Sequence, residues 1–411
     1  MSDLLRFLLQ VTIIIAASRT AALLLAHLRQ PPVMGEIMAG IVLGPAVLGY
    51  LAPDVWVTLF PAASLPLLST VSQFGLILFM FLVGLRLEPG HVKAQRRSAA
   101  VISVVSIALP FAGGAALALF IRDRLAPPHV STFAFAFFLG VAMSVTAFPV
   151  LARILSDTGL ISTPLGSVAI ACAAVDDVVA WVLLAAGGAI AHSGVEGTGA
   201  LRVLLLLVVY AALVLAARPL LARLARNGPG GPSVSYDRLA AVILIGVLSA
   251  AATEWIGIHA LFGAFFVGLA MPKAPAFVGQ VTRMLEPISA VVLLPIFFAY
   301  TGLRMRALPV NAELWLDAAL ILFVAVAGKW GGAALAGRAT GLTWRDASSL
   351  GVLLNTRGLV ELVILNVGLD LGILSPALFS LMVLMALITT GMAPPVLRVL
   401  QNHRASVGDG I

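Results

Sequence analysis

The sequence has little cysteine, little charge and few aromatic side chains for its length. Its 411 residues include one cysteine, Cys172, so no intrachain disulfide can form. Charged residues make up 10% of the chain and hydrophobic residues 61%, whereas soluble domains are about a quarter charged. This composition excludes a soluble globular protein and predicts an integral membrane protein whose surroundings are a lipid bilayer.

The motifs of nucleotide-dependent and covalent chemistry are also missing. The sequence contains no Walker A loop, no Gly-rich dinucleotide loop, no Gly-x-Ser-x-Gly elbow and no Cys/His metal cluster. We therefore expect no enzyme, no cofactor and no nucleotide as a partner. The formal charge of +7 is assigned to membrane loops and not to binding of nucleic acid. Transport by such a chain must be driven by an ion gradient.

Long apolar runs are what the chain has instead. A helix that spans a bilayer needs about 17–25 mainly apolar residues. We expect an all-α polytopic membrane protein in which residues 1–400 form one membrane unit and 401–411 a short cytoplasmic tail. The runs predict about 13 transmembrane helices, near 4–28, 34–51, 67–88, 98–121, 131–155, 163–192, 199–225, 236–254, 257–273, 281–303, 312–338, 344–369 and 374–400.

The distribution of Lys and Arg predicts the orientation of these helices. The loops after odd-numbered helices and the C-terminal tail hold about 16 of them, and the other side holds about 6. Because cytoplasmic loops collect positive charge, we expect the N-terminus outside the cell and the C-terminus in the cytoplasm.

Two halves of the chain resemble each other. The stretch GEIMAGIVLGP (35–45) is similar to HALFGAFFVGLAMP (259–272), and Gly84-Leu85-Arg86 matches Gly302-Leu303-Arg304. The offset is about 220 residues, or seven predicted helices, so the second copy enters the membrane the opposite way up. We expect inverted repeats near 34–193 and 257–400, with a binding site near the midplane at broken helices.

Two predicted helices carry such interruptions at corresponding places. The fifth helix contains SVTAFPVLAR, which begins at Ser144 and includes Pro149, a residue that removes a backbone donor. The twelfth contains a polar, glycine-bearing break formed by Asn355, Thr356 and Arg357. A single proline is usually only a kink, but matched interruptions in both halves predict two broken helices.

Five charged residues stand out as hard to place in loops: Asp176 and Asp177, then Lys329, then Arg357 and Glu361. Each ionised group at a helix centre costs about 2.5–3.5 kcal/mol on insertion scales, so each needs a partner or a function. Arg357 and Glu361 are four residues apart and can pair directly, which we interpret as a structural brace of the interrupted helix.

The remaining three charges do not balance. A purely structural ionic cluster is possible, but two Asp and one Lys leave a carboxylate over. Desolvation favours the protonated form of that group, so it can hold either a proton or a metal cation, the minimal chemistry of an exchanger. Neighbouring residues point about 100° apart on a helix, so the sequence leaves open whether Asp176 or Asp177 faces Lys329.

Several stretches resemble those of the monovalent cation:proton antiporter-2 family and follow one another in the same order as in that family. The resemblance is strongest to bacterial sodium/proton antiporters and to the membrane part of plant cation/proton exchangers. They cover nearly the whole chain. They are PPVMGEIMAGIVLGPAVLG (31–49), LFMFLVGLRL (78–87), SVTAFPVLARIL (144–155), AAVDDVVAW (173–181), GIHALFGAFFVGLAMP (257–272), LLPIFFAYTGL (293–303) and NTRGLVELVILNVG (355–368).

The resemblance implies a homodimer in which core elements, about 67–193 and 281–400, move against dimerisation elements, about 4–51 and 199–273. It implies that Asp177 binds the monovalent cation or the proton, that Asp176 pairs with Lys329, and that Thr146 lines the site. It also implies that the two interrupted helices cross near this site. A paired Asp-Asp is typical of electrogenic exchange in this family, whereas plant-like relatives often have Asn-Asp. Control by a soluble regulatory domain is not expected.

We therefore expect a secondary active antiporter of Na⁺ or K⁺ and protons in the cell membrane, with a role in pH homeostasis. One alternative is a gated cation efflux channel or uniporter on the same fold. Another is an intramembrane aspartyl protease, which needs two Asp facing each other across a peptide, normally from different helices. The sequence does not distinguish Na⁺ from K⁺.

Overall fold

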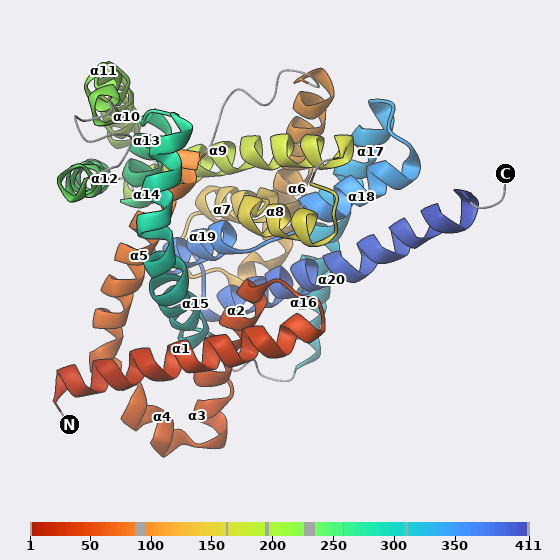
Figure 1. The fold of residues 1–411 in the computed structure, drawn as a ribbon. Coiled ribbons are helices and arrows are strands. Elements are labelled where there is room, and N and C mark those ends of the chain that lie inside the picture. Colours follow the sequence, from red (N-terminus) through yellow and green to blue (C-terminus); the bar gives the residue numbers. More distant parts are fainter. Residues whose placement is uncertain are drawn as a thin grey trace.

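The computed structural model of the chain describes residues 2–86, 96–161, 163–193, 197–225, 235–257, 259–306, 308 and 311–408. All regular structure in these ranges is helical (Figure 1). The first half contains α1 (Asp3–His27), α2 (Pro32–Leu43), α3 (Leu48–Leu51), α4 (Pro53–Leu59), α5 (Leu65–Arg86), α6 (Arg96–Leu125), α7 (Thr132–Ser144), α8 (Phe148–Asp157) and α9 (Pro164–Ser193).

The rest contains α10 (Gly197–Ala216), α11 (Arg218–Leu221), α12 (Tyr236–Ile256), α13 (Leu261–Ala270), α14 (Pro275–Ile288), α15 (Leu294–Leu303), α16 (Ala312–Val326), α17 (Gly332–Ala339), α18 (Trp344–Leu354), α19 (Leu359–Asp370) and α20 (Pro376–Gly408). Two π-helical segments, Ser289–Leu293 and Ala327–Gly331, join α14 to α15 and α16 to α17. Helix α20 continues into the predicted tail 401–411, as far as Gly408.

The all-α polytopic fold predicted from the sequence is confirmed. Nine helices in the described ranges are long and apolar enough to cross a membrane, or up to eleven if two bent pairs each form one span. Every predicted range contains a helix, but two are shorter than expected. The range 131–155 is broken between α7 and α8. In the range 257–273, α13 covers Leu261–Ala270, and the left-handed Gly257 that precedes it ends α12.

The helices pack mainly as two bundles. The first contains α1, α2, α5 and α12–α15, the second contains α6–α9 and α16–α20, and α10 contacts helices of both. In Figure 1, α7, α8 and α19 lie near the middle of the molecule, whereas α10, α11 and α12 stand at one edge. By their packing, α5 and α15 belong with the elements 4–51 and 199–273, whereas the resemblance implies that they belong with the core ranges 67–193 and 281–400.

Glycines allow close approach of the helices in the first bundle. A Cβ atom at Gly84 of α5 would lie 2.2 Å from the carbonyl oxygen of Phe265, and one at Gly268 of α13 would lie 2.3 Å from that of Phe81. Gly302 of α15 meets the backbone of Gly40 on α2 in the same way. Helix α5 of the first predicted repeat thus packs against α13 of the second, and α2 of the first packs against α15 of the second. The repeats near 34–193 and 257–400 stay a prediction.

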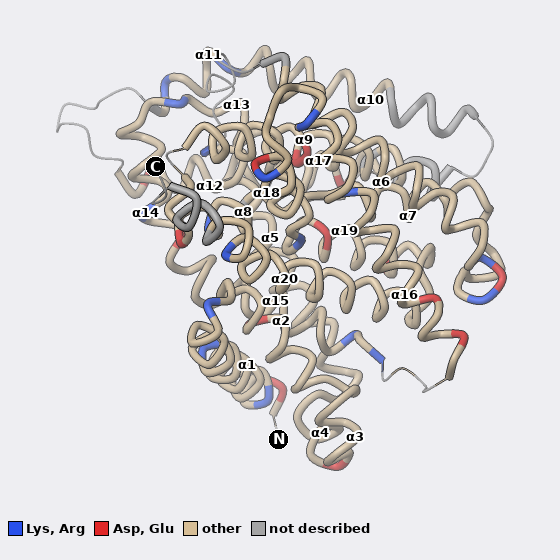
Figure 2. Tube along the Cα trace, turned by 90° about the vertical axis from the view of Figure 1, so that its right-hand side faces the viewer, with Lys and Arg blue, Asp and Glu red and all other residues tan. Residues whose placement is uncertain are grey.

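Charged residues lie mostly at the ends of helices and in connections, with long uncharged stretches between them (Figure 2). The second bundle holds the exceptions that matter here. Six charged residues of this bundle are at most 1% exposed. One of them, Asp317 of α16, pairs with the partly exposed Arg124 near the end of α6, and the other five lie in the interior, namely Asp176, Asp177, Lys329, Arg357 and Glu361. Their partners decide what the bundle can do.

Candidate ion-binding site

The two interrupted helices predicted from the sequence are present, and their interruptions cross. Helix α7 ends at Ser144 and α8 begins at Phe148, with extended backbone between them. Helices α18 and α19 are bent by 43° at their break. The N–H of Ala147 in the first break donates to the carbonyl oxygen of Thr356 in the second at 3.0 Å, so the two breaks are in contact.

Local sequence explains both breaks. Pro149 lies in the first turn of α8, where its missing N–H has no helical partner to lose, and without that N–H a helix cannot continue through it from Val145, four residues earlier. In the second break, a Cβ atom at Gly358 would lie 2.8 Å from Cγ2 of Val150 and 3.3 Å from Cβ of Ala147. Glycine at this position therefore lets the second break lie against α8.

Lys329 binds Asp176 at the first break. Its Nζ atom lies 2.8 Å from Oδ2 of Asp176 and 2.5 Å from the carbonyl oxygen of Ser144, and both ionic side chains are fully buried. Thr146 has one hydroxyl proton to donate, either to Oδ2 of Asp176 at 2.7 Å or to the carbonyl oxygen of Leu354 at 2.9 Å. The structure therefore brings together four of the residues singled out in the sequence.

Arg357 spans the two breaks. Its guanidinium group lies 3.1 Å from Oε2 of Glu361 and donates to the carbonyl oxygens of Ala142 at 2.8 Å and Met143 at 2.7 Å. Together with Lys329 it binds three successive carbonyl groups at the end of α7. These groups have no partner within their own helix, and the negative end of the helix dipole favours cations there.

Asp177 is different, since its fully buried carboxylate forms no ion pair and no hydrogen bond of good geometry among the described residues, and only the backbone N–H of Phe148, at the start of α8, is aimed at it. Oδ1 of Asp176 and both polar side-chain atoms of Asn355 also have no hydrogen-bond partner among the described residues. The hydroxyl group of Thr356 donates to the carbonyl oxygen of Leu353, three residues earlier in the same segment. Unpaired buried polar atoms call for an explanation, and oxygen atoms of carboxylates and amides are the ligands of hard cations.

The charges in this interior do not cancel. Three carboxylates, of Asp176, Asp177 and Glu361, face two cations, of Lys329 and Arg357. One proton or one monovalent cation at Asp177 completes the balance. Within the described residues no group of three His, Cys, Asp or Glu side chains could hold a metal ion, so a zinc-type site is not formed there.

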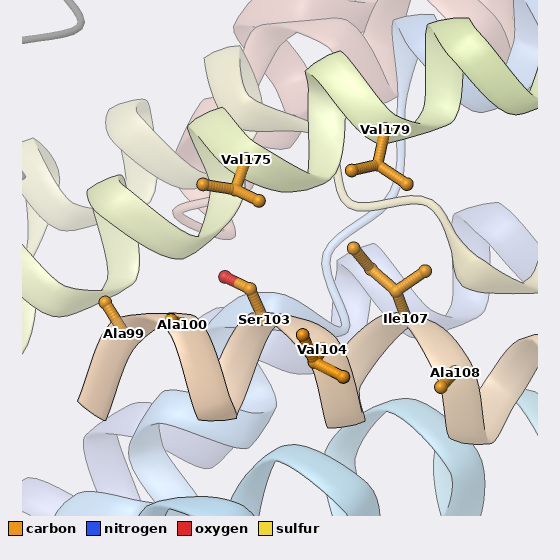
Figure 3. A pocket seen from close by; sticks show the side chains of 8 residues that line it. All are labelled: Ala99, Ala100, Ser103, Val104, Ile107, Ala108, Val175 and Val179. Atoms are coloured by element: carbon orange, nitrogen blue, oxygen red, sulfur yellow. The ribbon is translucent and has the colours of Figure 1, made fainter. Parts of the chain in front are cut away.

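A groove of about 380 Å³ lies on another side of α9, the helix that carries Asp176 and Asp177 (Figure 3). Val175 and Val179 of α9 point into it, opposite Ser103, Val104 and Ile107 of α6. Ser103 is its only polar lining side chain. Because the lining is almost wholly apolar, this groove suits hydrocarbon and does not provide the ligands of an ion.

Thr390 of α20 is a residue that the sequence reading missed. Its hydroxyl group accepts the N–H of Arg357 at 2.8 Å and donates to the carbonyl oxygen of Arg357 at 2.7 Å. It thereby satisfies both backbone groups of the residue in the middle of the second break. Threonine is common in apolar helices, and no pattern around Thr390 signals this contact.

Residues 13–402 match the model of the transmembrane sodium/hydrogen exchanger family. The chain belongs to this family. It is 43% identical over 398 residues to the Na⁺/H⁺ antiporter NhaS4 of Synechocystis sp., covering 96% of this chain and 97% of that protein. The resemblance drawn from the motifs is thus confirmed at the level of the family.

Other family members are longer than this chain. Cation/H⁺ antiporter 20 of Arabidopsis thaliana is 40% identical, with 94% of this chain and 47% of that protein aligned. The K⁺/H⁺ antiporter 1 of Saccharomyces cerevisiae is 34% identical, with 100% of this chain and 48% of that protein aligned. The chain therefore spans about half the length of these two proteins. The solved sodium/proton antiporter MjNhaP1 of Methanocaldococcus jannaschii shares the fold, with a TM-score of 0.66 at 12% identity over 98% of each chain.

Proposed function

We propose that the chain exchanges Na⁺ or K⁺ for protons, and that Asp177 is the carboxylate at which the cation and the proton compete. The observation that supports this most is a fully buried carboxylate that has no cationic partner among the described residues, next to a carboxylate that is paired with Lys329. A buried charge without a counter-charge is strongly unfavourable. Asp177 is therefore stable only while it holds a proton or a cation.

Competition at one group couples the two fluxes. A cation that reaches Asp177 from one side displaces the proton, and a proton that reaches it from the other side displaces the cation. Asp176 stays paired with Lys329 during this exchange, and Thr146 and Asn355 offer oxygen atoms near the break. Displacement of the second bundle against the first would expose the site to each side in turn.

Several finer properties belong to the same proposal. The Asp-Asp pair supports electrogenic exchange, with more than one proton for each cation. The loop charges support an N-terminus outside the cell membrane and a C-terminus inside it. The family resemblance supports a homodimer. The relatives' names include both Na⁺/H⁺ and K⁺/H⁺ antiporters, so both cations are candidates.

The test uses purified protein in liposomes with an imposed pH gradient, and Na⁺ and K⁺ fluxes are measured at several pH values. We expect Asp177→Asn to reduce exchange to the level of empty liposomes. A matched control is Asp157→Asn in α8 of the same bundle, because Asp157 forms an exposed pair with Arg153 and should leave exchange nearly unchanged.

Two outcomes would contradict the proposal. Exchange by Asp177→Asn at the wild-type rate would remove Asp177 from the mechanism. Cation flux without any counter-movement of protons in the wild-type protein would instead indicate the gated channel or uniporter. Equal thermal unfolding of both variants in detergent shows that loss of flux is not loss of fold.

A further inference from the structure

Polar contacts between the two bundles gather at the end of α15. Arg304 donates to Oδ1 of Asp370 at 2.6 Å and to Oδ1 of Asn366 at 3.0 Å, and both acceptors lie on α19. Asn366 in turn donates to the hydroxyl group of Thr301 on α15 at 2.9 Å. We call these four residues the polar latch, since each of its bonds joins one bundle to the other.

Aromatic rings hold Arg304 of the latch in place, but the ion pair of the latch is partly exposed. The Arg304 guanidinium lies over the rings of Tyr300 at 5.5 Å and Phe379 at 6.0 Å. Its side chain is 17% exposed and that of Asp370 is 45% exposed. Partly exposed ion pairs add little net stability, so a pair of this kind can open and form again.

An apolar contact joins the same two bundles close to the latch. Trp181 of α9 lies with its ring centroid 5.6 Å from that of Phe262 and 6.2 Å from that of Phe265, both on α13. Trp181 follows Asp177 by four residues and so lies on the same face of α9. Leu261, next to Phe262, lines the small cavity that contains Arg304 and Asp370.

We propose that the polar latch and the aromatic contact of Trp181 with Phe262 and Phe265 form one gate, which closes one side of the Asp177 site. This rests on the proposed exchange at Asp177. Helix α9 carries both Asp177 and Trp181, so one displacement of the second bundle moves the site and separates the aromatic contact. The same displacement separates Arg304 from Asp370.

The first experiment locks the latch. In a Cys172→Ala background, Arg304→Cys and Asp370→Cys are joined by a thiol crosslinker that a reductant cleaves. We expect crosslinking to lower cation/proton exchange at least tenfold and reduction to restore it. The matched control is Arg124→Cys with Asp317→Cys, an Arg–Asp pair whose two helices, α6 and α16, lie within the second bundle. Its crosslink should leave exchange unchanged.

Exchange at the uncrosslinked rate by a fully crosslinked Arg304→Cys/Asp370→Cys protein would overturn the gate and leave Asp177 untouched. Conversely, exchange by Asp177→Asn would overturn the ion site, whereas the crosslink would still report movement. If the cysteine pair lowers exchange before crosslinking, the reversal Arg304→Asp/Asp370→Arg replaces it. Its exchange should exceed that of each single reversal, and equal values would contradict the latch.

The second experiment removes the aromatic contact of Trp181 with Phe262 and Phe265 from the gate. Trp181→Ala should raise passive cation leak across the liposome at least fivefold, because the gate loses its largest side chain. Trp181→Phe, which keeps an aromatic ring against Phe262, should remain near the wild-type leak. A Trp181→Ala protein with wild-type leak and wild-type coupling would exclude Trp181 from the gate.

Discussion

The two interrupted spans cross at one point but satisfy their free backbone groups by different chemistry. At the first break, the carbonyl groups at the end of α7 are bound by charged side chains, those of Lys329 and Arg357. At the second, the backbone of Arg357 is bound by the neutral hydroxyl group of Thr390. The first break is therefore stabilised by two buried cationic side chains, whereas the backbone of the second is stabilised by a neutral one.

This difference explains why one acid is left over. Each cation that binds the end of α7 needs its own carboxylate, and these are Asp176 for Lys329 and Glu361 for Arg357. Asp177 follows the paired Asp176 directly in the sequence, but the described residues provide no third buried cation to pair with it. The reactive group of the proposed exchange is thus a consequence of how the first break is stabilised, and the following variants test that relation.

The largest effect is expected at the cation that touches both breaks. Arg357→Gln leaves Glu361 charged and buried and removes the donors to the carbonyl groups of Ala142 and Met143. Removing one partner of a buried pair costs about 3–5 kcal/mol. We expect a large fall in thermal stability in detergent, and Arg357→Gln/Glu361→Gln should recover part of it. A single variant as stable as wild type would mean that the first break does not depend on charge.

A somewhat smaller loss is expected for Lys329→Met, about 3 kcal/mol, because Asp176 loses its cation but keeps the hydroxyl group of Thr146. Thermal unfolding checks the value. Adding Asp176→Asn should restore stability, since it removes the unpaired charge. If Asp177→Asn restored stability to the same extent, the two acids would not have the unequal roles assigned to them.

The sequence was sufficient for the fold and for the list of interior residues, since apolar runs and charges within them are local features. The residues alone left open which Asp meets Lys329, and only the family resemblance implied the pair with Asp176 that the structure contains. Lys329 lies in the π-helical segment Ala327–Gly331, which adds a residue to one turn and shifts the helix face, and no periodicity signals this. The grouping of α5 and α15 with the first bundle likewise depends on contacts across the chain.

At the second break the effect should be smaller, because the groups concerned are neutral. Thr390→Val keeps the shape of the side chain but leaves the N–H and carbonyl groups of Arg357 without their partner, at about 1–3 kcal/mol. Thr390→Ser keeps the hydroxyl group and should lose much less. Thermal unfolding separates the two variants. A loss for Thr390→Val as large as that for Arg357→Gln would contradict the contrast between the breaks.

The smallest effect concerns the close approach of the breaks. In Gly358→Ala the new Cβ atom meets Cγ2 of Val150 at 2.8 Å, and because the clash involves side-chain atoms and no backbone atom, we expect a loss of about 1 kcal/mol. Gly279→Ala in α14 is the control, since a Cβ there meets nothing within 4 Å and should stabilise the helix slightly. Equal melting temperatures for the two variants would show that the breaks tolerate separation. The bond from Ala147 to Thr356 would then not be what holds the crossing together.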